Sequence, residues 1–288
     1  MTNWEDLHHF VVLAREKTLS AAARALDVDH ATVARRVAAL EAATAMKLVD
    51  RRTRTTTLTE DGRRIAAIAV SMEEAAFAVE RAVQAAKPGI GGEVTVSAPP
   101  SLANALIAPE LAGLLRRHPA LRIKLIGEKR SASLTRREAD IALRLSRPDE
   151  PGLIARKIGR FGFSLYGAEE YIRETPPHAL AFIAYDGAMD EAPQQIWLKA
   201  VAGDREIVLR TNDLENQAAA ARTGVGLAAL PHFLGDPDPR LTRYQPGGRT
   251  VAPRAVIRDI WLLVHRDLRK VPAVRVVMEF LAGCVEAG

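Results

Sequence analysis

Cysteine is nearly absent from this sequence: among 288 residues there is one, Cys284. A single cysteine excludes a disulfide bond within the chain and excludes a metal site built from a cysteine cluster. The neighbours of Cys284 are mostly apolar, so we expect a buried and unreactive thiol. The spacing of the other residues indicates no metal site and no bound organic cofactor, and we expect neither.

Long apolar runs are also missing. No stretch approaches the ~18 uninterrupted apolar residues of a membrane-spanning helix. The first ten residues, MTNWEDLHHF, include acidic side chains and lack the apolar core of a signal peptide. We therefore expect a cytoplasmic protein that does not act in a membrane.

The short motifs of common enzyme active sites are absent as well. The sequence has no GxSxG, HExxH or P-loop spacing. Gly224, Val225 and Gly226 lack the third glycine of a dinucleotide-binding loop. Because no set of nucleophile, base and acid emerges, we expect that the protein is not an enzyme.

The residues that are present describe a soluble globular protein with a slight excess of positive charge. Lysine and arginine number 40 against 35 aspartates and glutamates, which gives a formal net charge of +5. This excess suits a polyanionic partner without proving one. The length allows two or three domains, each with a substantial hydrophobic core.

Residues 20–41, SAAARALDVDHATVARRVAALE, predict two short helices joined by a tight turn. Ser20 and Asp29 are suited to cap the two helices, because their side-chain oxygens can accept from first-turn amides. One face of the second helix is apolar and consists of Val33, Val37 and Leu40. The opposite face carries Ala31, Thr32, Arg35 and Ala39, with Arg36 on the flank. This pattern is typical of a helix-turn-helix that enters the DNA major groove; an alanine-rich hairpin in a larger bundle is the alternative.

The order of residues from Phe10 to Gly62 resembles the N-terminal domain of LysR-type transcriptional regulators. The matching segments are Phe10 with Ala14, Ser20 with AAARAL, then VARRVAALE, LVDRR and LTEDG. The resemblance implies a winged helix-turn-helix over residues 1–58 that binds double-stranded promoter or operator DNA. We assign the DNA contacts to Ser20, His30, Ala31, Thr32, Arg35, Arg36, Arg51 and Arg54.

Five positions depart from the family pattern. The family usually has Ser-Gln where this chain has Asp29-His30, and Ser where it has Ala34. It also usually has Gly at Ala45 and Phe at Val49. The first departures alter the surface that would face DNA, whereas the last two alter a helix end and a packing position.

Residues 48–58, LVDRRTRTTTL, favour a short antiparallel hairpin because they combine β-branched threonines with arginines. Beside a helix-turn-helix, such a hairpin is a wing whose basic edge contacts phosphates, which position a protein without specifying sequence. A solvated charged hairpin with no DNA contact is the alternative.

Residues 59–87 predict a long helix that begins after the cap residue Thr59. Apolar residues recur along it at alternating spacings of four and three, as in the seam of a coiled coil. We assign dimerisation to this seam: Ile65, Ala69, Met72, Ala76, Val79 and Val83. The segment resembles the dimer-forming linker helix of the LysR family, and packing against the C-terminal part of the same chain is the alternative.

Residues 88–92, PGIGG, predict a hinge, after which strands and helices alternate as in a mainly parallel α/β sheet. The predicted strands are 94–97, 121–127, 140–145, 163–166, 181–185, 206–210, 227–230 and 260–265. The predicted helices are 101–117, 133–137, 213–223 and 272–285.

The region 93–288 resembles the effector-binding domain of the LysR family. That resemblance implies a two-lobed fold like a periplasmic binding protein, in which the chain crosses twice between the lobes. Lobe one is then 93–162 with 266–288, and lobe two is 163–265. A small-molecule effector is expected in the crevice between them.

Two loops and one arginine are the candidate effector-binding residues. Ligands of open α/β folds lie beyond the carboxyl ends of strands, near helix N-termini. Pro100, Ser101 and Leu102 open one helix after a strand, and the free amides of Ser101, Leu102 and Ala103 favour an anion. Arg144 ends a strand and could pair with a carboxylate, while Asn212 precedes another helix. Ser101 and Asn212 could instead act as helix caps, and Arg144 could bind a neighbouring acid of the chain.

We therefore predict a dimeric or tetrameric LysR-type transcriptional regulator whose DNA binding is modulated by a small organic acid. RNA polymerase is a further candidate partner. The rival functions are a solute-binding protein of the transport class and an enzyme on an α/β scaffold. The DNA-binding module and the missing signal peptide disfavour the first rival, and the missing catalytic set disfavours the second.

Overall fold

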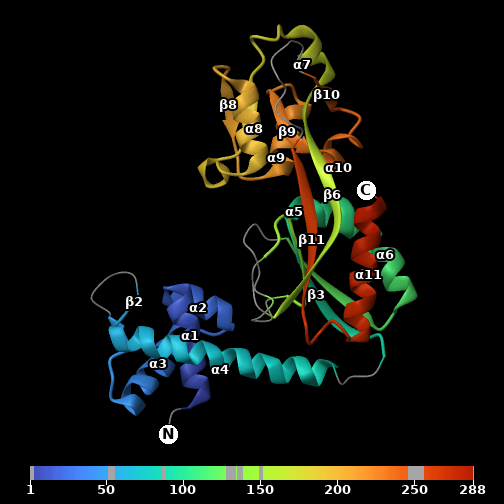
Figure 1. The fold of residues 1–288 in the computed structure, drawn as a ribbon. Helices are drawn as coiled ribbons and strands as arrows, with labels where there is room; N and C mark the ends of the chain where they lie inside the picture. Colours follow the sequence, from blue (N-terminus) through green and yellow to red (C-terminus); the bar gives the residue numbers. More distant parts are fainter. Residues whose placement is uncertain are drawn as a thin grey trace. The chain divides into compact units, whose positions relative to one another are not determined.

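The computed structural model describes residues 3–50, 56–85, 89–127, 134, 139–148, 152–245 and 256–287. The chain divides into two compact units, Met1–Gln84 and Ala85–Gly288. Figure 1 shows the first as a group of helices and the second as a sheet covered by helices. The predicted linker helix belongs to the first unit rather than standing apart from it.

The described part of the N-terminal unit contains four helices and a small hairpin. Its elements are α1 (Trp4–Glu16), α2 (Leu19–Leu26), α3 (His30–Thr44), β1 (Val49–Asp50), β2 (Thr57–Leu58) and α4 (Glu60–Ala85). The predicted apolar face of α3 is confirmed, because Val33, Val37 and Leu40 are almost fully buried. They pack with Phe10 and Leu13 of α1, so α1 supports the two-helix unit.

The first cap of the helix-turn-helix differs from the prediction. Helix α2 begins at Leu19, and the Thr18 hydroxyl accepts from the Ala21 amide at 3.1 Å. Ser20 therefore lies inside the helix, on its exposed side, and the prediction that it caps α2 was wrong. Asp29 caps α3 as predicted, because its carboxylate accepts from the Thr32 amide at 2.6 Å.

Glu41 connects the end of α3 to the start of the wing. Its buried carboxylate accepts from the amides of Leu48 and Val49 at 2.9 and 3.2 Å. Burial opposes ionisation, but these amides and the Lys47 ammonium keep the pKa of Glu41 below its usual value. The predicted hairpin follows, since β1 and β2 pair antiparallel.

Helix α4 has two different halves. Ala69 is buried, and Ile65 packs against the same core as α1 and α3. These two residues hold α4 on its own chain, so their assignment to a dimer seam was wrong. Farther along, Met72, Val79 and Val83 are exposed, as a seam toward another chain requires.

The described part of the second unit contains one nine-stranded sheet in the order β4-β3-β5-β11-β6-β9-β7-β8, with β10 pairing to β6. The first strands are β3 (Gly92–Ala98), β4 (Leu121–Gly127), β5 (Ile141–Arg144) and β6 (Leu153–Gly167). The others are β7 (Phe182–Ala184), β8 (Ile207–Arg210), β9 (Leu227–Pro231), β10 (Thr242–Tyr244) and β11 (Ile257–His265).

The helices of this domain include one irregular run and several regular segments. The run contains α5 (Pro100–Leu102), a π-helical turn (Ala103–Ile107), a 3-10 turn (Ala108–Glu110) and α6 (Leu111–Arg117). Pro109 lies in the 3-10 turn, where its missing amide proton suits a break in the helix. The regular segments are α7 (Glu169–Glu174), α8 (Pro193–Ala202), α9 (Leu214–Arg222), α10 (His232–Gly235) and α11 (Pro272–Ala287).

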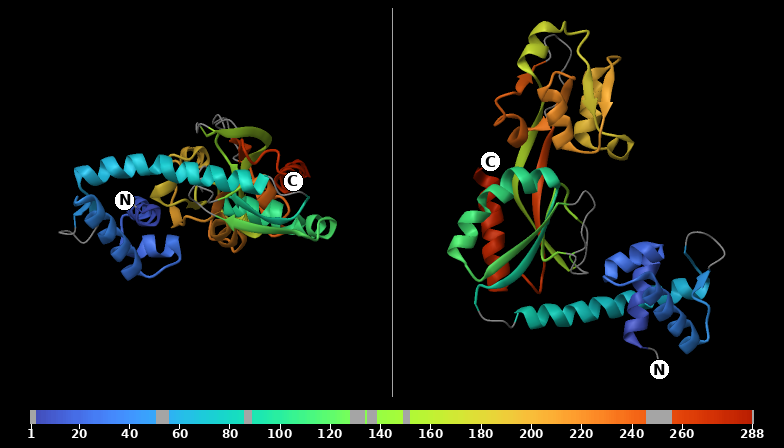
Figure 2. Two further views of the ribbon diagram at one scale, coloured as in Figure 1. Left: turned by 90° about the horizontal axis from the view of Figure 1, so that it is seen from below. Right: turned by 180° about the vertical axis from the view of Figure 1, so that it is seen from behind.

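Two long strands connect the two lobes. Strands β6 and β11 pair antiparallel over most of their length and lie side by side in Figure 1 and in the right view of Figure 2. Parallel pairs occur within each lobe, β3 with β4 and β5, and β7 with β8 and β9. The sheet is therefore mixed, whereas the alternation of strands and helices had predicted a mainly parallel one.

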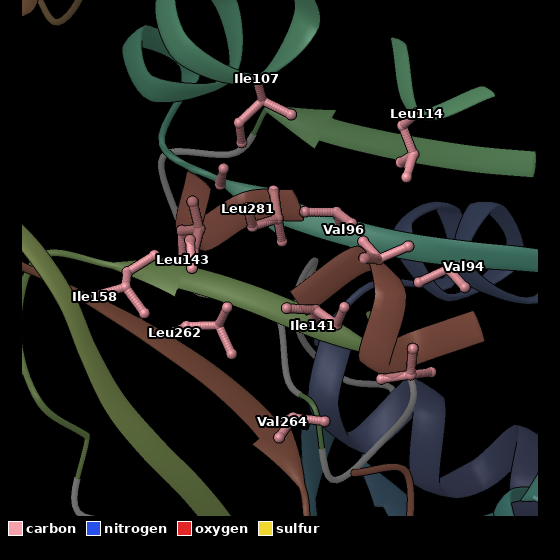
Figure 3. Packing of buried hydrophobic residues seen from close by; sticks show 14 of the residues in the cluster. Val94, Val96, Ile107, Leu114, Ile141, Leu143, Ile158, Leu262, Val264 and Leu281 are labelled. Atoms are coloured by element: carbon pink, nitrogen blue, oxygen red, sulfur yellow. The ribbon is translucent and has the colours of Figure 1, made fainter. Parts of the chain in front are cut away.

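The return to lobe one comes earlier than the predicted boundary at residue 265. Strand β11 pairs with β5, and its residues Ile260, Leu262 and Val264 lie in the core of lobe one. The second crossing is thus at the start of β11, near residue 257. Figure 3 shows this core, in which residues of β3, β5 and β11 meet the C-terminal helix through Leu281.

Lobe two has apolar side chains on both faces of its strands. On one face Phe182 and Leu227 pack with Leu198 of α8. On the other face Ile183 and Ala228 pack with α9, because neighbouring strand residues point to opposite sides. Helices α7, α8 and α10 and strand β10 were not predicted. The predicted helix 133–137 lies outside the described residues, except for the buried Leu134.

Candidate functional site

The outer face of α3 is open to solvent. His30, Ala31 and Arg35 are exposed, and Thr32 is half-buried against its cap. Since the opposite face fills the core, these residues form the surface that this helix can offer to DNA. Ser20 is exposed on α2, although it does not cap that helix.

Arg36 is directed to α1 instead. Its guanidinium lies 2.6 Å from the Glu5 carboxylate and 3.2 Å from that of Asp6. An arginine held by two carboxylates supports the packing of α3 on α1 and is poorly placed to bind a base. We therefore replace its predicted DNA contact with a structural role.

The wing arginines Arg51 and Arg54 lie outside the described residues. What the structure describes is the base of the hairpin, where Val49 pairs with Leu58 and Asp50 with Thr57. The predicted phosphate contacts of the two arginines stay a prediction.

An exposed apolar stripe follows α4. The exposed fractions are 48% for Met72, 65% for Val79 and 58% for Val83, while Ala76 is half-buried. Ile68, which the prediction missed, is 60% exposed and precedes Met72 by one helical turn. We call these four large residues the α4 stripe: Ile68, Met72, Val79 and Val83.

A cleft of about 620 Å³ lies between the two lobes of the effector domain. Pro100, Ser101, Arg144 and Asn212 all line it, as predicted from their places beyond strand ends. Lobe two adds residues from the segments around Tyr185, α8 and α9. The cleft is also lined by apolar and aromatic residues that the prediction did not include: Leu145, Phe161, Phe163, Met189, Leu214, Pro231 and Phe233.

Leu102 does not face this cleft. Its side chain is 1% exposed and belongs to the core of lobe one. The amide of the next residue, Ala103, already donates to the Pro99 carbonyl at 3.0 Å. The assignment of Leu102 to the effector site was therefore wrong, and Ser101 at the cleft surface remains the candidate from this loop.

Arg144 occupies the lobe-one side of the cleft. It donates to the Ser97 hydroxyl at 3.3 Å, to the Ser97 carbonyl at 3.4 Å and to the Leu143 carbonyl at 2.8 Å. These bonds orient the guanidinium at the end of β5, beside the cleft. Ser97, which is fully buried, thus acts as a support for Arg144.

Arg258 is the second cation of the cleft, and the prediction missed it. It is half-buried and donates to the Gln194 side chain at 3.1 Å and to the Leu145 carbonyl at 3.2 Å. Burial lowers the pKa of its guanidinium. The sequence did contain a sign of this role. Arg258 lies two residues before Ile260 and four before Leu262, which are both buried, so on an alternating strand it takes the place of an apolar residue on the core face.

The lobe-two side of the cleft is rich in hydrogen-bonding groups. Tyr185 is buried beside Gln194, and burial raises the pKa of its hydroxyl to about 12. Asp213 caps α9 by accepting from the Glu215 amide at 2.9 Å. Asp186 and Glu215 line the same wall, so three carboxylates lie opposite the two arginines.

The described residues offer neither a metal site nor a membrane span. No group of three or more histidine, cysteine, aspartate or glutamate side chains in the described ranges is arranged to hold a metal ion. No helix in the same ranges is long and apolar enough to cross a bilayer. Cys284 is buried as predicted, and burial raises its pKa to about 11.

Two family models match the chain, one in each of the two units. Residues 4–63 match the model of the bacterial regulatory helix-turn-helix protein, lysR family. Residues 87–284 match the LysR substrate binding domain. The second match alone covers more than half of the chain.

Characterised relatives extend over nearly the whole sequence. The chain is 29% identical over 283 residues to the Mau operon transcriptional activator of Paracoccus denitrificans, covering 97% of this chain and 95% of that protein. It is 31% identical over 229 residues to the AhcY transcriptional activator HvrB of Rhodobacter capsulatus, covering 77% of each.

Solved structures share the fold. Full-length AphB, the virulence activator of Vibrio cholerae, aligns with a TM-score of 0.62 at 20% identity and covers 98% of this chain and 99% of that one. CrgA of Neisseria meningitidis aligns with a TM-score of 0.56 at 23% identity and covers 99% of both. The chain therefore belongs to the LysR family: it is a transcriptional regulator and not an enzyme, with a helix-turn-helix domain that binds DNA and a C-terminal domain that binds a small-molecule effector.

Proposed function

We propose that the effector of this regulator is a small carboxylate-bearing molecule bound in the cleft between the lobes. The observation that carries the proposal is Arg258. Its half-buried guanidinium donates to an amide and a carbonyl oxygen, and among the described residues no carboxylate pairs with it. A partly desolvated cation without a counter-ion favours an anionic ligand, and Arg144 lines the same cleft.

The other walls of the cleft support an organic acid rather than an inorganic anion. Phe161, Phe163 and Phe233 give the cleft an apolar surface that an inorganic ion would leave uncovered. Asp186 and Glu215 on the opposite wall favour a hydrogen-bond donor at the far end of the molecule. A hydroxy acid or an amino acid would satisfy both walls.

The bonds of Arg258 suggest how binding is transmitted. Gln194 belongs to α8 of lobe two, and Leu145 follows β5 of lobe one, so Arg258 connects the lobes. A ligand carboxylate would compete with these oxygens for the guanidinium and so change the closure of the cleft. The closure would act on the DNA-binding units through the segment 88–92 and the paired α4 helices.

On the DNA side, we propose that α3 reads bases and that the wing grips phosphates. Arg35 is exposed on the outer face of α3, and an arginine forms two hydrogen bonds with guanine. His30, Ala31 and Thr32 would contact neighbouring base edges, while Arg51 and Arg54 would contact phosphates. The α4 stripe would hold two copies together, and a dimer or tetramer on promoter DNA could then contact RNA polymerase.

The effector proposal is tested by thermal unfolding of the full-length protein with a panel of small organic acids. A ligand at 100 times its dissociation constant stabilises by about 2.7 kcal/mol. Arg258→Gln should abolish the stabilisation by the acid that is found and leave DNA binding near normal. Arg144→Ala should have the same effect.

The matched control is Arg122→Gln, because Arg122 is exposed on β4 and does not line the cleft. It should respond to the acid as the unchanged protein does. If only neutral or cationic compounds stabilise the protein, or if Arg258→Gln keeps the full response, the carboxylate proposal is wrong.

A further inference from the structure

The start of α3 carries an exposed carboxylate–hydroxyl pair. Asp29 accepts from the Thr32 amide at 2.6 Å through one oxygen. Its other oxygen accepts from the Thr32 hydroxyl at 3.0 Å. The only proton of that hydroxyl is therefore already used within the protein.

This pair can offer only acceptor oxygens and a methyl group to a DNA base. A threonine hydroxyl normally adapts to donors and acceptors alike, but here its donor side is occupied by Asp29. The two hydrogen bonds from Thr32 lower the pKa of Asp29, and the nearby Arg35 adds to this effect. The carboxylate is thus ionised at neutral pH.

Few groups on DNA suit an ionised carboxylate. Phosphates repel it, and the major-groove edges of guanine and thymine present acceptors. Adenine has one donor, but its N7 acceptor stands beside it. On its own major-groove edge cytosine presents the N4 amino group as a donor and no acceptor, and carboxylates are known to accept from that group.

We propose that Asp29 and Thr32 select a cytosine in each operator half-site by accepting from its exocyclic amino group. The inference rests on the proposed reading of bases by α3. The same carboxylate repels the phosphates of DNA that lacks the cytosine at this position, so it also lowers binding to random sequence.

The experiment uses the full-length protein and operators selected from a randomised duplex library. For each variant, the preferred base at every position and the affinity for random duplex are measured at one salt concentration. Asp29→Asn keeps a side chain that caps helices as well as aspartate does, so α3 should stay folded. Thr32→Val keeps the branched shape of threonine and removes the hydroxyl.

In Asp29→Asn, one base pair should lose its preference for cytosine by about fivefold or more. Binding to random duplex should rise several-fold, since the repulsion is gone. Thr32→Val should weaken the preference at the same base pair. The matched control is Asp27→Asn: Asp27 is exposed in the turn with φ 53°, a conformation that asparagine tolerates, and the charge change is identical.

The outcomes separate this inference from the proposal on which it rests. If Arg35→Ala changes the selected sequence and Asp29→Asn changes none of it, the cytosine inference is wrong and base reading by α3 stands. A base pair that responds to Asp29→Asn but prefers A·T or T·A over both G·C and C·G also refutes it. If neither variant alters the sequence, α3 does not read bases. If Asp27→Asn raises the affinity for random duplex as much as Asp29→Asn does, the repulsion comes from the net charge of the protein and the role of Asp29 against random sequence is wrong.

Discussion

The N-terminal unit and the effector domain leave different groups unsatisfied. In the N-terminal unit the charged side chains near the core pair with one another, and the most exposed large apolar residues among those described are the α4 stripe. In the effector domain the cleft holds Arg258, to which no carboxylate of the described residues pairs. The internal ion pairs of the N-terminal unit are Arg36 with Glu5 and Asp6, Lys47 with Glu41, and Arg15 with Glu73.

The difference indicates which partner each unit needs. An exposed apolar stripe on one helix is covered most simply by the same helix of another copy, because like residues then bury one another. A cation in a cleft is satisfied by an anion that enters from solution. Assembly is thus expected to depend on hydrophobic burial and sensing on charge, and the two can be disturbed separately.

The largest effect should follow from charging the stripe. Met72→Asp with Val79→Asp would place like charges across a dimer interface, while both positions tolerate charge in a monomer because they are exposed. We expect the variant to sediment as a monomer. Its affinity for the operator should fall by about a hundredfold or more, because a monomer loses the avidity of two linked DNA-binding sites.

Two exposed apolar residues of lobe two provide the control for this experiment. Ile196 is 56% exposed and Val208 is 42% exposed. Ile196→Asp with Val208→Asp adds the same charge and should leave the oligomer intact. If the stripe variant remains a dimer, the exposed half of α4 packs within its own chain and the contrast between the units fails.

A medium effect should follow from breaking an internal ion pair of the N-terminal unit. Glu73 is 1% exposed and lies 3.4 Å from both Arg15 and His8 of α1. Glu73→Gln removes the buried carboxylate that pairs with Arg15 and should destabilise the unit by about 3 kcal/mol. Amide hydrogen exchange of α1 and α4 measures the loss. The control is Glu60→Gln on the exposed first turn of α4, which should destabilise the unit by only a fraction of that free energy.

The smallest effect tests the corrected helix cap. Thr18→Ala removes the hydroxyl that accepts from Ala21 and should destabilise α2 by about 1 kcal/mol. Ser20→Ala should change its stability by less than about 0.5 kcal/mol, because Ser20 is an exposed residue inside the helix. Equal effects of the two substitutions on the exchange of α2 amides would restore Ser20 as the cap.

The sequence predicted most where neighbours in the chain decide the structure. The core face of α3, its cap Asp29 and the wing hairpin depend on residues a few positions apart, so periodicity and capping chemistry were sufficient. The prediction that Ser20 caps α2 was wrong because Thr18, two residues earlier, has the same capping chemistry. Ile65 and Ala69 were misassigned because a seam pattern does not tell which partner covers it.

The effector cleft was harder because it is assembled from distant segments. Strand ends identified Ser101, Arg144 and Asn212, but Arg258 reaches the cleft only through the pairing of β11 with β5 and β6. The lobe boundary was misplaced for the same reason. Periodicity describes the strand around Arg258, and only the sheet order shows what that strand faces.

The two-sided use of α4 has a consequence for exchanging modules between regulators. Ile65, Ala69 and Glu73 complete the core that surrounds the helix-turn-helix, and the α4 stripe begins on the same turns. A chimera joined after residue 58 would separate the helix-turn-helix from the α4 residues that complete its core. A junction after residue 84, where the first compact unit ends, would transfer a self-sufficient module. Such a graft would bring its choice of dimer partner with it, so DNA recognition and partner choice are expected to be inherited together.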